Sequence, residues 1–374
     1  MEVSKTMSNI KVAKEPLIRF TKRTDISRTK TILIRAVAVV LSLIVAAIVI
    51  VCVTGLNPLE VYVSMFEGAF SSTRRIWITF RDTMVLLCIA IALAPAFKMK
   101  FWNIGAEGQM LVGGIVTAGI MIYFGNSLPM PVLMPLMLIS SLVVGALWGL
   151  LPAVFKAYWN TNETLFTLMM NYVAIQLTSF FVAQWENPFG SNTVGIINAN
   201  TQGGWFPAIF GQTYVLNVII VVLIMIGMYI YLGNTKQGYE VAVVGESENT
   251  ARYAGINVKW VVIRTMLISG ALCGLAGFIG VAGVDHTIST GTAGGRGFTA
   301  IIVAWMSKFN TYTMFIVSFF LVFLDQGAKE IASSFNLNEY ASEVVTGIIL
   351  FFLLGCEFFI NYKVILRNKS KEEA

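Results

Sequence analysis

The sequence predicts an all-α integral membrane protein with about ten transmembrane helices. Of its 374 residues, 56% are hydrophobic and only 12% are charged, which leaves too little polar surface for a soluble protein of this length. The hydrophobic residues gather in runs of about 20, the length that an α-helix needs to cross roughly 30 Å of hydrocarbon. Because a helix satisfies its own backbone hydrogen bonds in lipid, we expect these runs to be helical.

The first expected span, residues 36–54, is uncharged and follows Arg35. It is too long, and begins too far into the chain, for an ordinary cleaved signal peptide. The second, residues 81–97, is short, so either residues 76–80 extend it or it is a broken or tilted helix with Pro95 near its end. Seven further spans are expected at residues 104–124, 132–155, 164–184, 214–233, 261–284, 312–331 and 344–362.

One apolar run, residues 298–307, is too short to cross a membrane alone. A glycine-rich stretch, residues 289–297, comes directly before it. We expect the two stretches to form a half-helix or re-entrant element buried against protein, because irregular backbone at membrane depth needs such cover.

The basic residues give the orientation of the chain. The net charge of +6 does not indicate a nucleic-acid partner, because the lysines and arginines cluster beside the spans. Only five of the 26 fall in segments on the side opposite to the N-terminus, and these are Arg74, Arg75, Arg81, Arg296 and Lys329. Cytoplasmic loops carry the excess of positive charge, so both termini are predicted to be cytoplasmic.

This orientation predicts a basic cytoplasmic tail, a transmembrane domain and a charged cytoplasmic tail, at residues 1–30, 31–362 and 363–374. Two outer loops, residues 55–80 and 185–213, are long enough to carry structure. Within the first, residues 57–80 have apolar residues at helical spacing, which fits an amphipathic surface helix. The second fits an ordered loop that a soluble partner can contact. For both loops, a mere connector remains the alternative.

The inner loop of residues 234–260 has the signals of a short capped helix. Ser247 is placed as its N-cap, Glu248 adds a favourable charge to the first turn, and Gly255 is placed to end the helix in the left-handed conformation. A helix of about two turns is marginal alone and needs a tertiary or partner surface. A loop helix without a partner remains the alternative.

Polar residues also stand at membrane depth. Asn103, Glu107 and Gln109 lie at the start of the third span, and Asn171 and Gln176 lie in the fifth. Such residues either line a water-filled path or anchor helices to one another. Glycines four residues apart in the fourth and seventh spans predict close helix packing, and they are Gly145, Gly149, Gly270 and Gly274.

The sequence contains no pattern of an active site. The glycine cluster of residues 291–297 lacks the lysine of a phosphate-binding loop, so ATP would have to be bound by another subunit. The single histidine, His286, follows Asp285 without a nucleophile nearby in the sequence, and the four cysteines lie in apolar runs without metal spacing. We therefore expect no enzymatic activity, no catalytic residue, and no metal or cofactor in this chain.

Three segments resemble a known family. Residues 101–109, Phe-Trp-Asn-Ile-Gly-Ala-Glu-Gly-Gln, resemble the F-N-I-G-x-E-G-Q signature of ABC importer permeases in the branched-chain amino acid and ribose permease family. Residues 245–256 are similar to that family's cytoplasmic G-x-N-x-x-A-A-R-Y-x-G-I loop, and residues 162–172 to its N-E-V-I-x-T-L-M-L-N-Y segment. The sequence departs from these family motifs at Trp102, Ser247 and Thr250. The combination most closely resembles the nucleoside and simple-sugar branch.

The resemblance implies a multi-pass plasma-membrane subunit that forms a translocation path for nucleosides, purine nucleosides first. A permease for a simple sugar such as ribose or galactose is the alternative within the family. An ion-coupled secondary transporter, using Glu107, Asp285 or Asp325, is the alternative outside it. The residues assigned to the path are Asn103, Glu107, Gln109, Asn171 and Gln176.

The resemblance also implies partners. A cytoplasmic ABC ATPase that binds ATP and Mg²⁺ would receive the loop helix. A second permease subunit, identical or different, would complete the pore, and an extracellular substrate-binding lipoprotein would deliver the substrate. The residues assigned to coupling with the ATPase are Glu246, Glu248, Ala251, Arg252, Tyr253 and Gly255.

Overall fold

A computed structural model describes residues 18–23, 27–209 and 211–366. The chain divides into two compact units, one of Met1–Ser64 with Ala328–Ala374 and one of Met65–Gly327. Residues 1–17 and 24–26 of the predicted N-terminal tail, and 367–374 of the predicted C-terminal tail, lie outside the described residues. The assignment of both tails to the cytoplasm stays a prediction.

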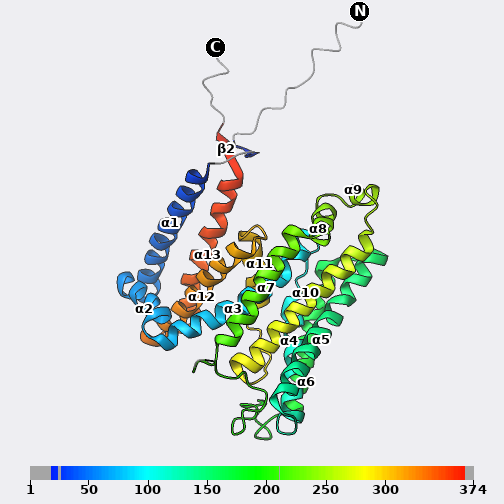
Figure 1. The fold of residues 1–374 in the computed structure, drawn as a ribbon. Helices are drawn as coiled ribbons and strands as arrows, with labels where there is room; N and C mark the ends of the chain where they lie inside the picture. The colour runs from blue at the N-terminus through cyan, green and yellow to red at the C-terminus, as the bar shows by residue number, and fades with distance from the viewer. Residues whose placement is uncertain (1–17, 24–26, 210, 367–374) are drawn as a thin grey trace, which may run out of the picture. The chain divides into compact units, whose positions relative to one another are not determined.

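The described residues include nine helices that are long and apolar enough to cross a membrane. A tenth apolar helix, α11 (Arg296–Met306), is too short to do so. The all-α membrane fold with one short segment is therefore confirmed (Figure 1). The nine long helices are α1 (Arg28–Thr54), α3 (Thr73–Lys98), α4 (Ala106–Phe124), α5 (Met130–Trp159), α6 (Glu163–Gln184), α7 (Val215–Asn234), α10 (Val258–Gly280), α12 (Thr311–Ser334) and α13 (Glu339–Asn361).

In the first unit, α1 packs along α13. An ion pair joins the two helices, because Arg35 Nη2 lies 2.6 Å from Glu357 Oε1. Two short strands that the sequence did not predict, β1 (Ile18–Lys22) and β2 (Tyr362–Leu366), pair antiparallel beside them. They connect the two ends of this unit through backbone hydrogen bonds, which carry little sequence signal.

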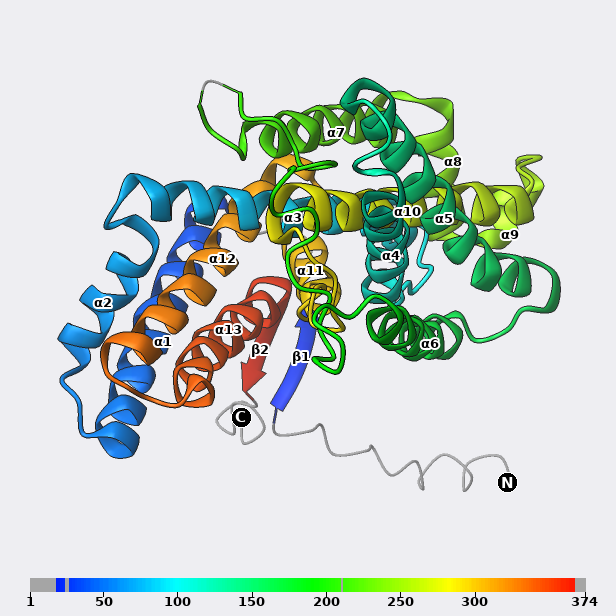
Figure 2. The same cartoon turned by 90° about the horizontal axis from the view of Figure 1, so that it is seen from below.

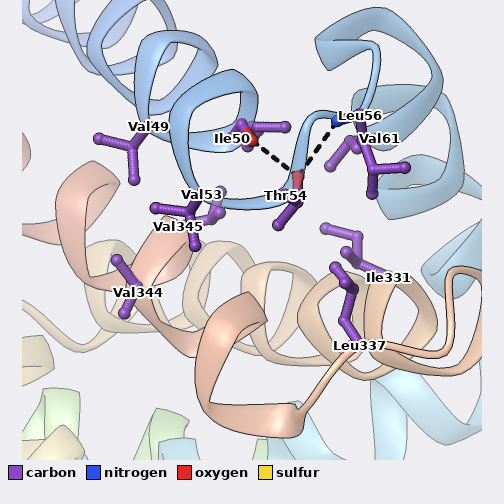
Figure 3. Close-up of a pocket in the computed structure, with 10 residues that line it drawn as sticks. All are labelled: Val49, Ile50, Val53, Thr54, Leu56, Val61, Ile331, Leu337, Val344 and Val345. Atoms are coloured by element: carbon purple, nitrogen blue, oxygen red, sulfur yellow. Dashed lines mark hydrogen bonds between the residues drawn. The ribbon is translucent and has the colours of Figure 1, made fainter.

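The same unit encloses a small apolar cavity of about 70 Å³ near the end of α1 (Figure 3). The hydroxyl of Thr54 donates to the carbonyl oxygen of Ile50 at 2.6 Å and accepts from the backbone N–H of Leu56 at 3.3 Å. Gly55 ends α1 in the left-handed conformation, with φ at +68°. The other lining residues are aliphatic, and the hydroxyl of Thr54 is already hydrogen-bonded within the chain, so this cavity is poorly suited to recognising a polar ligand.

In the second unit, α10 lies against α3, α4 and α5 (Figure 2). The predicted close packing of glycines is confirmed between α5 and α10. A Cβ atom added to Gly145 would lie 2.4 Å from the carbonyl oxygen of Gly270, and one added to Gly149 would lie 2.8 Å from that of Met266. Such backbone approach maximises dispersion contacts between helices in lipid.

The outer segment of residues 57–80 is not one helix. It divides into α2 (Pro58–Phe70) and the beginning of α3, where Ser72 Oγ accepts from the backbone N–H of Arg75 at 3.3 Å and starts the new helix. Residues 76–80 therefore extend the short second span, as one of our two alternatives required. Pro95 lies inside the last turn of α3 without ending it.

Candidate translocation site and docking segment

Asn103 and Gln109 bind each other through their side-chain amides. Asn103 Nδ2 donates to Gln109 Oε1 at 3.2 Å, and Gln109 Nε2 donates to Asn103 Oδ1 at 3.3 Å. Asn103 Nδ2 also donates to Ser269 Oγ on α10 at 3.2 Å, and the backbone N–H of Gly105 donates to Asn103 Oδ1 at 3.0 Å. Both amides are buried, so they fix the turn between α3 and α4 and tie it to α10.

Asn171 ties α6 to the same turn. Its Oδ1 accepts from the backbone N–H of Gly108 at 2.8 Å, and its Nδ2 donates to the carbonyl oxygen of Ile104 at 2.9 Å. These bonds satisfy two backbone groups at the irregular start of α4, which lipid could not do. Thr167 contributes one more, because its Oγ1 accepts from the N–H of Ile104 at 3.2 Å.

Glu107 holds the short helix α11 by its first residues. Its Oε1 accepts from the backbone N–H of Gly295 at 2.8 Å, and its Oε2 accepts from that of Gly297 at 2.7 Å. The carboxylate thus satisfies two N–H groups at a helix N-terminus, where the helix dipole favours negative charge. A Cβ on Gly297 would lie 2.5 Å from the backbone nitrogen of Glu107, so only glycine allows this approach.

The chain that leads to α11 is irregular. α10 continues into a short π-helix, η1 (Val281–Asp285), and a loop then runs to Arg296. Ser289, Thr290, Gly291 and Gly294 of this loop are exposed. Irregular backbone at membrane depth is tolerated where it is buried in protein or lines a water-filled cavity, and interrupted helices form the substrate sites of many transporters. This loop is the most suitable part of the unit for a polar path.

Charged residues outside the predicted path hold the other side of the same loop. Asp82 Oδ1 lies 2.9 Å from Arg81 Nε and 3.9 Å from Arg296 Nη2, and Gln326 Nε2 donates to Asp82 Oδ2 at 2.8 Å. Asp82 is buried within α3. The adjacent Arg81 and Asp82 at the edge of an apolar run were the available signal, since charge at such depth is costly unless paired.

The outer loop of residues 185–213 docks onto the end of η1. The backbone N–H of Ile197 donates to the carbonyl oxygen of His286 at 2.8 Å, and that of Phe206 donates to Ala282 at 3.1 Å. The rings of His286 and Trp205 stack with centroids 3.8 Å apart. Burial, and then the charge of Arg81, lower the pKa of His286 to about 4. Residues 197–206 of this loop are therefore held by specific contacts.

The inner loop forms two helices, α8 (Lys236–Glu246) and α9 (Glu248–Tyr253), of which only the second was predicted. The predicted caps of α9 are confirmed. Ser247 Oγ accepts from the backbone N–H of Thr250 at 3.3 Å, and Gly255 has φ at +76°. The sequence did not predict α8, because Gly238 and Gly245 near its two ends weaken the helical pattern.

The side chains of α9 divide into an anchor and an exposed surface. Ala251 is fully buried in an apolar cluster with Val241 of α8 and Val258 of α10. Glu248 and Arg252 form an exposed ion pair at 3.5 Å, and Tyr253 is 94% exposed. Glu246 is also exposed. A short helix is thus fixed by one alanine and presents charged and aromatic groups outward.

The structure gathers four of the five residues assigned to the path around the start of α4, namely Asn103, Glu107, Gln109 and Asn171. Their polar atoms are engaged by protein groups. Gln176 stands apart, exposed on α6. A role of any of the five in the path stays a prediction.

Three known proteins that are similar to this chain along most of its length are all ABC transporter permeases. Across 319 residues the chain is 27% identical to the glucose ABC transporter permease protein TsgB13 of Haloferax volcanii, covering 82% of this chain and 83% of that one. It is 27% identical to the guanosine ABC transporter permease protein NupP of Bacillus subtilis, over 88% of this chain and 94% of that one. It is also 27% identical to the nucleoside ABC transporter permease protein NupB of Lactococcus lactis, over 87% and 92%.

No solved structure matches the chain significantly. Residues 75–354 match a family described as the branched-chain amino acid transport system / permease component. That match takes in the start of α4, the loop before α11 and both helices of the inner loop. The chain therefore belongs to this family of membrane permeases.

Proposed function

We propose that this chain is the nucleoside permease of an ABC importer, with purine nucleosides as the preferred substrates. The observation that carries the proposal is α9, a helix anchored by Ala251. Its other side chains are exposed and, among the residues that the structure describes, have no partner beyond the ion pair of Glu248 with Arg252. An exposed helix of this kind suits a groove on a cytoplasmic ATPase. ATP and Mg²⁺ would be bound there, and movement of α9 would be passed to α10 and α8.

The path is proposed to run past the loop of residues 286–295. This loop combines exposed backbone with the hydroxyls of Ser289 and Thr290, which suits the ribose of a nucleoside. A second, identical or different permease subunit would close the path on its open side, and an extracellular lipoprotein would deliver the substrate. The relatives described as guanosine and nucleoside ABC transporter permease proteins support this substrate class.

Docking can be tested by reversing the charge of Arg252. Arg252→Glu is expected to weaken ATPase association about tenfold or more, because arginines that become buried in an interface are among the few side chains that carry most of its binding energy. Affinity capture of the ATPase by detergent-purified chain measures the loss. Lys236→Glu, an equal charge change at an exposed residue of α8, is the control. Full ATPase capture by Arg252→Glu would contradict the docking role.

A glucose permease is the second candidate, because TsgB13 is as similar to this chain as the nucleoside permeases are. Uptake of labelled guanosine by cells that carry or lack this chain separates the two substrates. We expect excess unlabelled adenosine to suppress the uptake and excess glucose or ribose to leave it unchanged. Unaltered guanosine uptake in the deletion strain would refute the nucleoside assignment.

A further inference from the structure

A polar cavity of about 200 Å³ lies where several spans of the second unit end. It is lined by Lys98 at the end of α3, by Leu232 and Gly233 near the end of α7, and by the turn between α11 and α12. These ends lie at the same end of the unit as α8 (Figure 1). Since the basic residues predict this end to be cytoplasmic, the cavity stands at the level of the inner lipid headgroups.

Two lysines give this cavity a positive charge. Lys98 and Lys308 both line it, and no carboxylate does. Lys98 Nζ donates to the carbonyl oxygen of Leu232 at 3.2 Å, which leaves two of its three N–H groups for another acceptor. Within the described part of the chain, neither lysine forms an ion pair, whereas Lys156 and Arg264 pair with Glu163 and Glu240 at 3.0 and 3.1 Å.

A buried hydroxyl in the cavity wall also has no partner. Thr311, at the start of α12, is 1% exposed, and its Oγ1 forms no hydrogen bond among the described residues. An unsatisfied buried hydroxyl is costly. The hydroxyl oxygen is enclosed by protein, so an acceptor oxygen bound in the cavity would satisfy it only after the Thr311 side chain rotates towards the cavity. The backbone N–H groups of Tyr312 and Thr313 at the start of α12 already donate to Asn310 Oδ1 at 3.1 and 3.3 Å.

Tyr229 of α7 also lines the cavity, and its ring contacts that of Tyr312 on α12. The rings of Tyr229 and Tyr312 lie 4.8 Å apart and are 43% and 47% exposed. Tyrosine is enriched at the membrane–water interface because its ring is apolar and its hydroxyl is polar. A ligand of this cavity would thus carry its charge at headgroup depth and its apolar part along the two rings.

We propose that this cavity binds the phosphate of an anionic phospholipid from the inner leaflet. Lys98 and Lys308 hold the phosphate charge, the hydroxyl of Thr311 donates to one phosphate oxygen, and the acyl chains lie beside Tyr229 and Tyr312. Basic pockets between spans on the cytoplasmic side recognise headgroups in this way. The site adjoins the coupling helices, because a Cβ on Gly245 of α8 would meet the carbonyl oxygen of Lys98 at 2.0 Å.

Lipid retention by the purified full-length chain tests the site without any transport assay. The chain is placed in phosphatidylcholine nanodiscs with rising fractions of phosphatidylglycerol, and bound lipid is counted by native mass spectrometry. Each lysine changed to glutamine is expected to lower the apparent affinity for phosphatidylglycerol roughly fivefold. The double variant Lys98→Gln, Lys308→Gln should therefore retain little phosphatidylglycerol. Thr311→Val should lose part of the bound phosphatidylglycerol.

The matched control is Lys100→Gln with Lys236→Gln, which removes the same charge from exposed residues outside the cavity and should retain the lipid. Equal retention in the cavity and control double variants would overturn the proposal, as would equal retention of phosphatidylcholine. A further arm adds inorganic phosphate to chain in lipid-free detergent. A phosphate adduct that depends on the two lysines, without retained phosphatidylglycerol, would identify free phosphate as the ligand and refute the lipid.

Discussion

Single residues decide where the transmembrane structure is interrupted. Glu107 is buried and has no basic partner at hydrogen-bond distance among the described residues, yet both of its oxygens accept from backbone N–H groups at the start of α11. The carboxylate therefore replaces the water that would otherwise solvate a helix N-terminus. Gly297 makes the approach possible because it has no side chain.

Gly297→Ala should consequently destabilise the fold by about 1–3 kcal/mol, the usual cost of overpacking. Its Cβ would lie 2.5 Å from the backbone nitrogen of Glu107 and 2.7 Å from Oε2, so α11 must move away from the carboxylate. Thermal unfolding in detergent measures the effect. Gly291→Ala is the matched control, because its Cβ would meet only Ser289 Oγ at 3.6 Å. Equal melting temperatures for both variants would contradict this account.

His286 gives the fold a pH dependence with a definite sign. Its folded-state pKa is about 4, mainly through burial, whereas an unfolded histidine has a pKa of about 6.5. The unfolded state therefore binds the proton first, so stability present above pH 6.5 is lost as the pH falls towards 4.

We expect the melting temperature of the wild type to fall between pH 7.5 and 5. The fall should be smaller in His286→Asn, since asparagine tolerates the φ of +52° at this position and does not titrate. Because His286 is the only histidine of the chain, the difference between the two proteins isolates its contribution. Identical pH profiles would show that protonation of His286 has no effect on folding.

At the scale of elements, the sequence predicted long features better than short ones. The spans, the short α11 and the caps of α9 follow from apolar runs and from Ser247 and Gly255, which are local signals. α8 and the pairing of β1 with β2 were missed. Their formation depends on tertiary contacts, such as the approach of Gly245 to Lys98, that no local pattern records.

The candidate site shows the same limit. Sequence singled out Asn103, Glu107, Gln109 and Asn171 as polar residues at depth, but not which groups they bind. The partners of Glu107 are 188 and 190 residues away along the chain. Long-range pairs of this kind, including Asp82 with Gln326, cannot be read from spacing along a single helix.

The end of α9 yields a prediction for this element. Gly255→Val should impair folding of the inner loop, because φ at +76° costs a residue with a Cβ roughly 1–2 kcal/mol and a β-branched residue more. No atom lies within 4 Å of the added Cβ, so the effect comes from backbone strain alone. Gly255→Asn should restore ATPase capture and protease resistance of the loop. Equal behaviour of the two variants would rule out strain as the cause.

For the whole molecule, the central question is where the energy for transport enters. A self-sufficient ion-coupled transporter needs a carboxylate that can release its proton or cation during the cycle. Glu107 is held by two backbone N–H groups, and Asp82 is held by two arginines and Gln326. Both carboxylates are thereby committed to supporting the loop before α11.

Liposomes containing only this chain are therefore expected to accumulate no guanosine under a proton or Na⁺ gradient. Adding the second permease subunit, the binding protein, the ATPase and ATP should start uptake, because α9 would then transmit the ATPase movement to α8 and α10. An assembly whose ATPase lacks its phosphate-binding lysine is the control and should remain inactive. Gradient-driven accumulation by the chain alone would refute the importer mechanism and assign ion coupling to Glu107, Asp285 or Asp325.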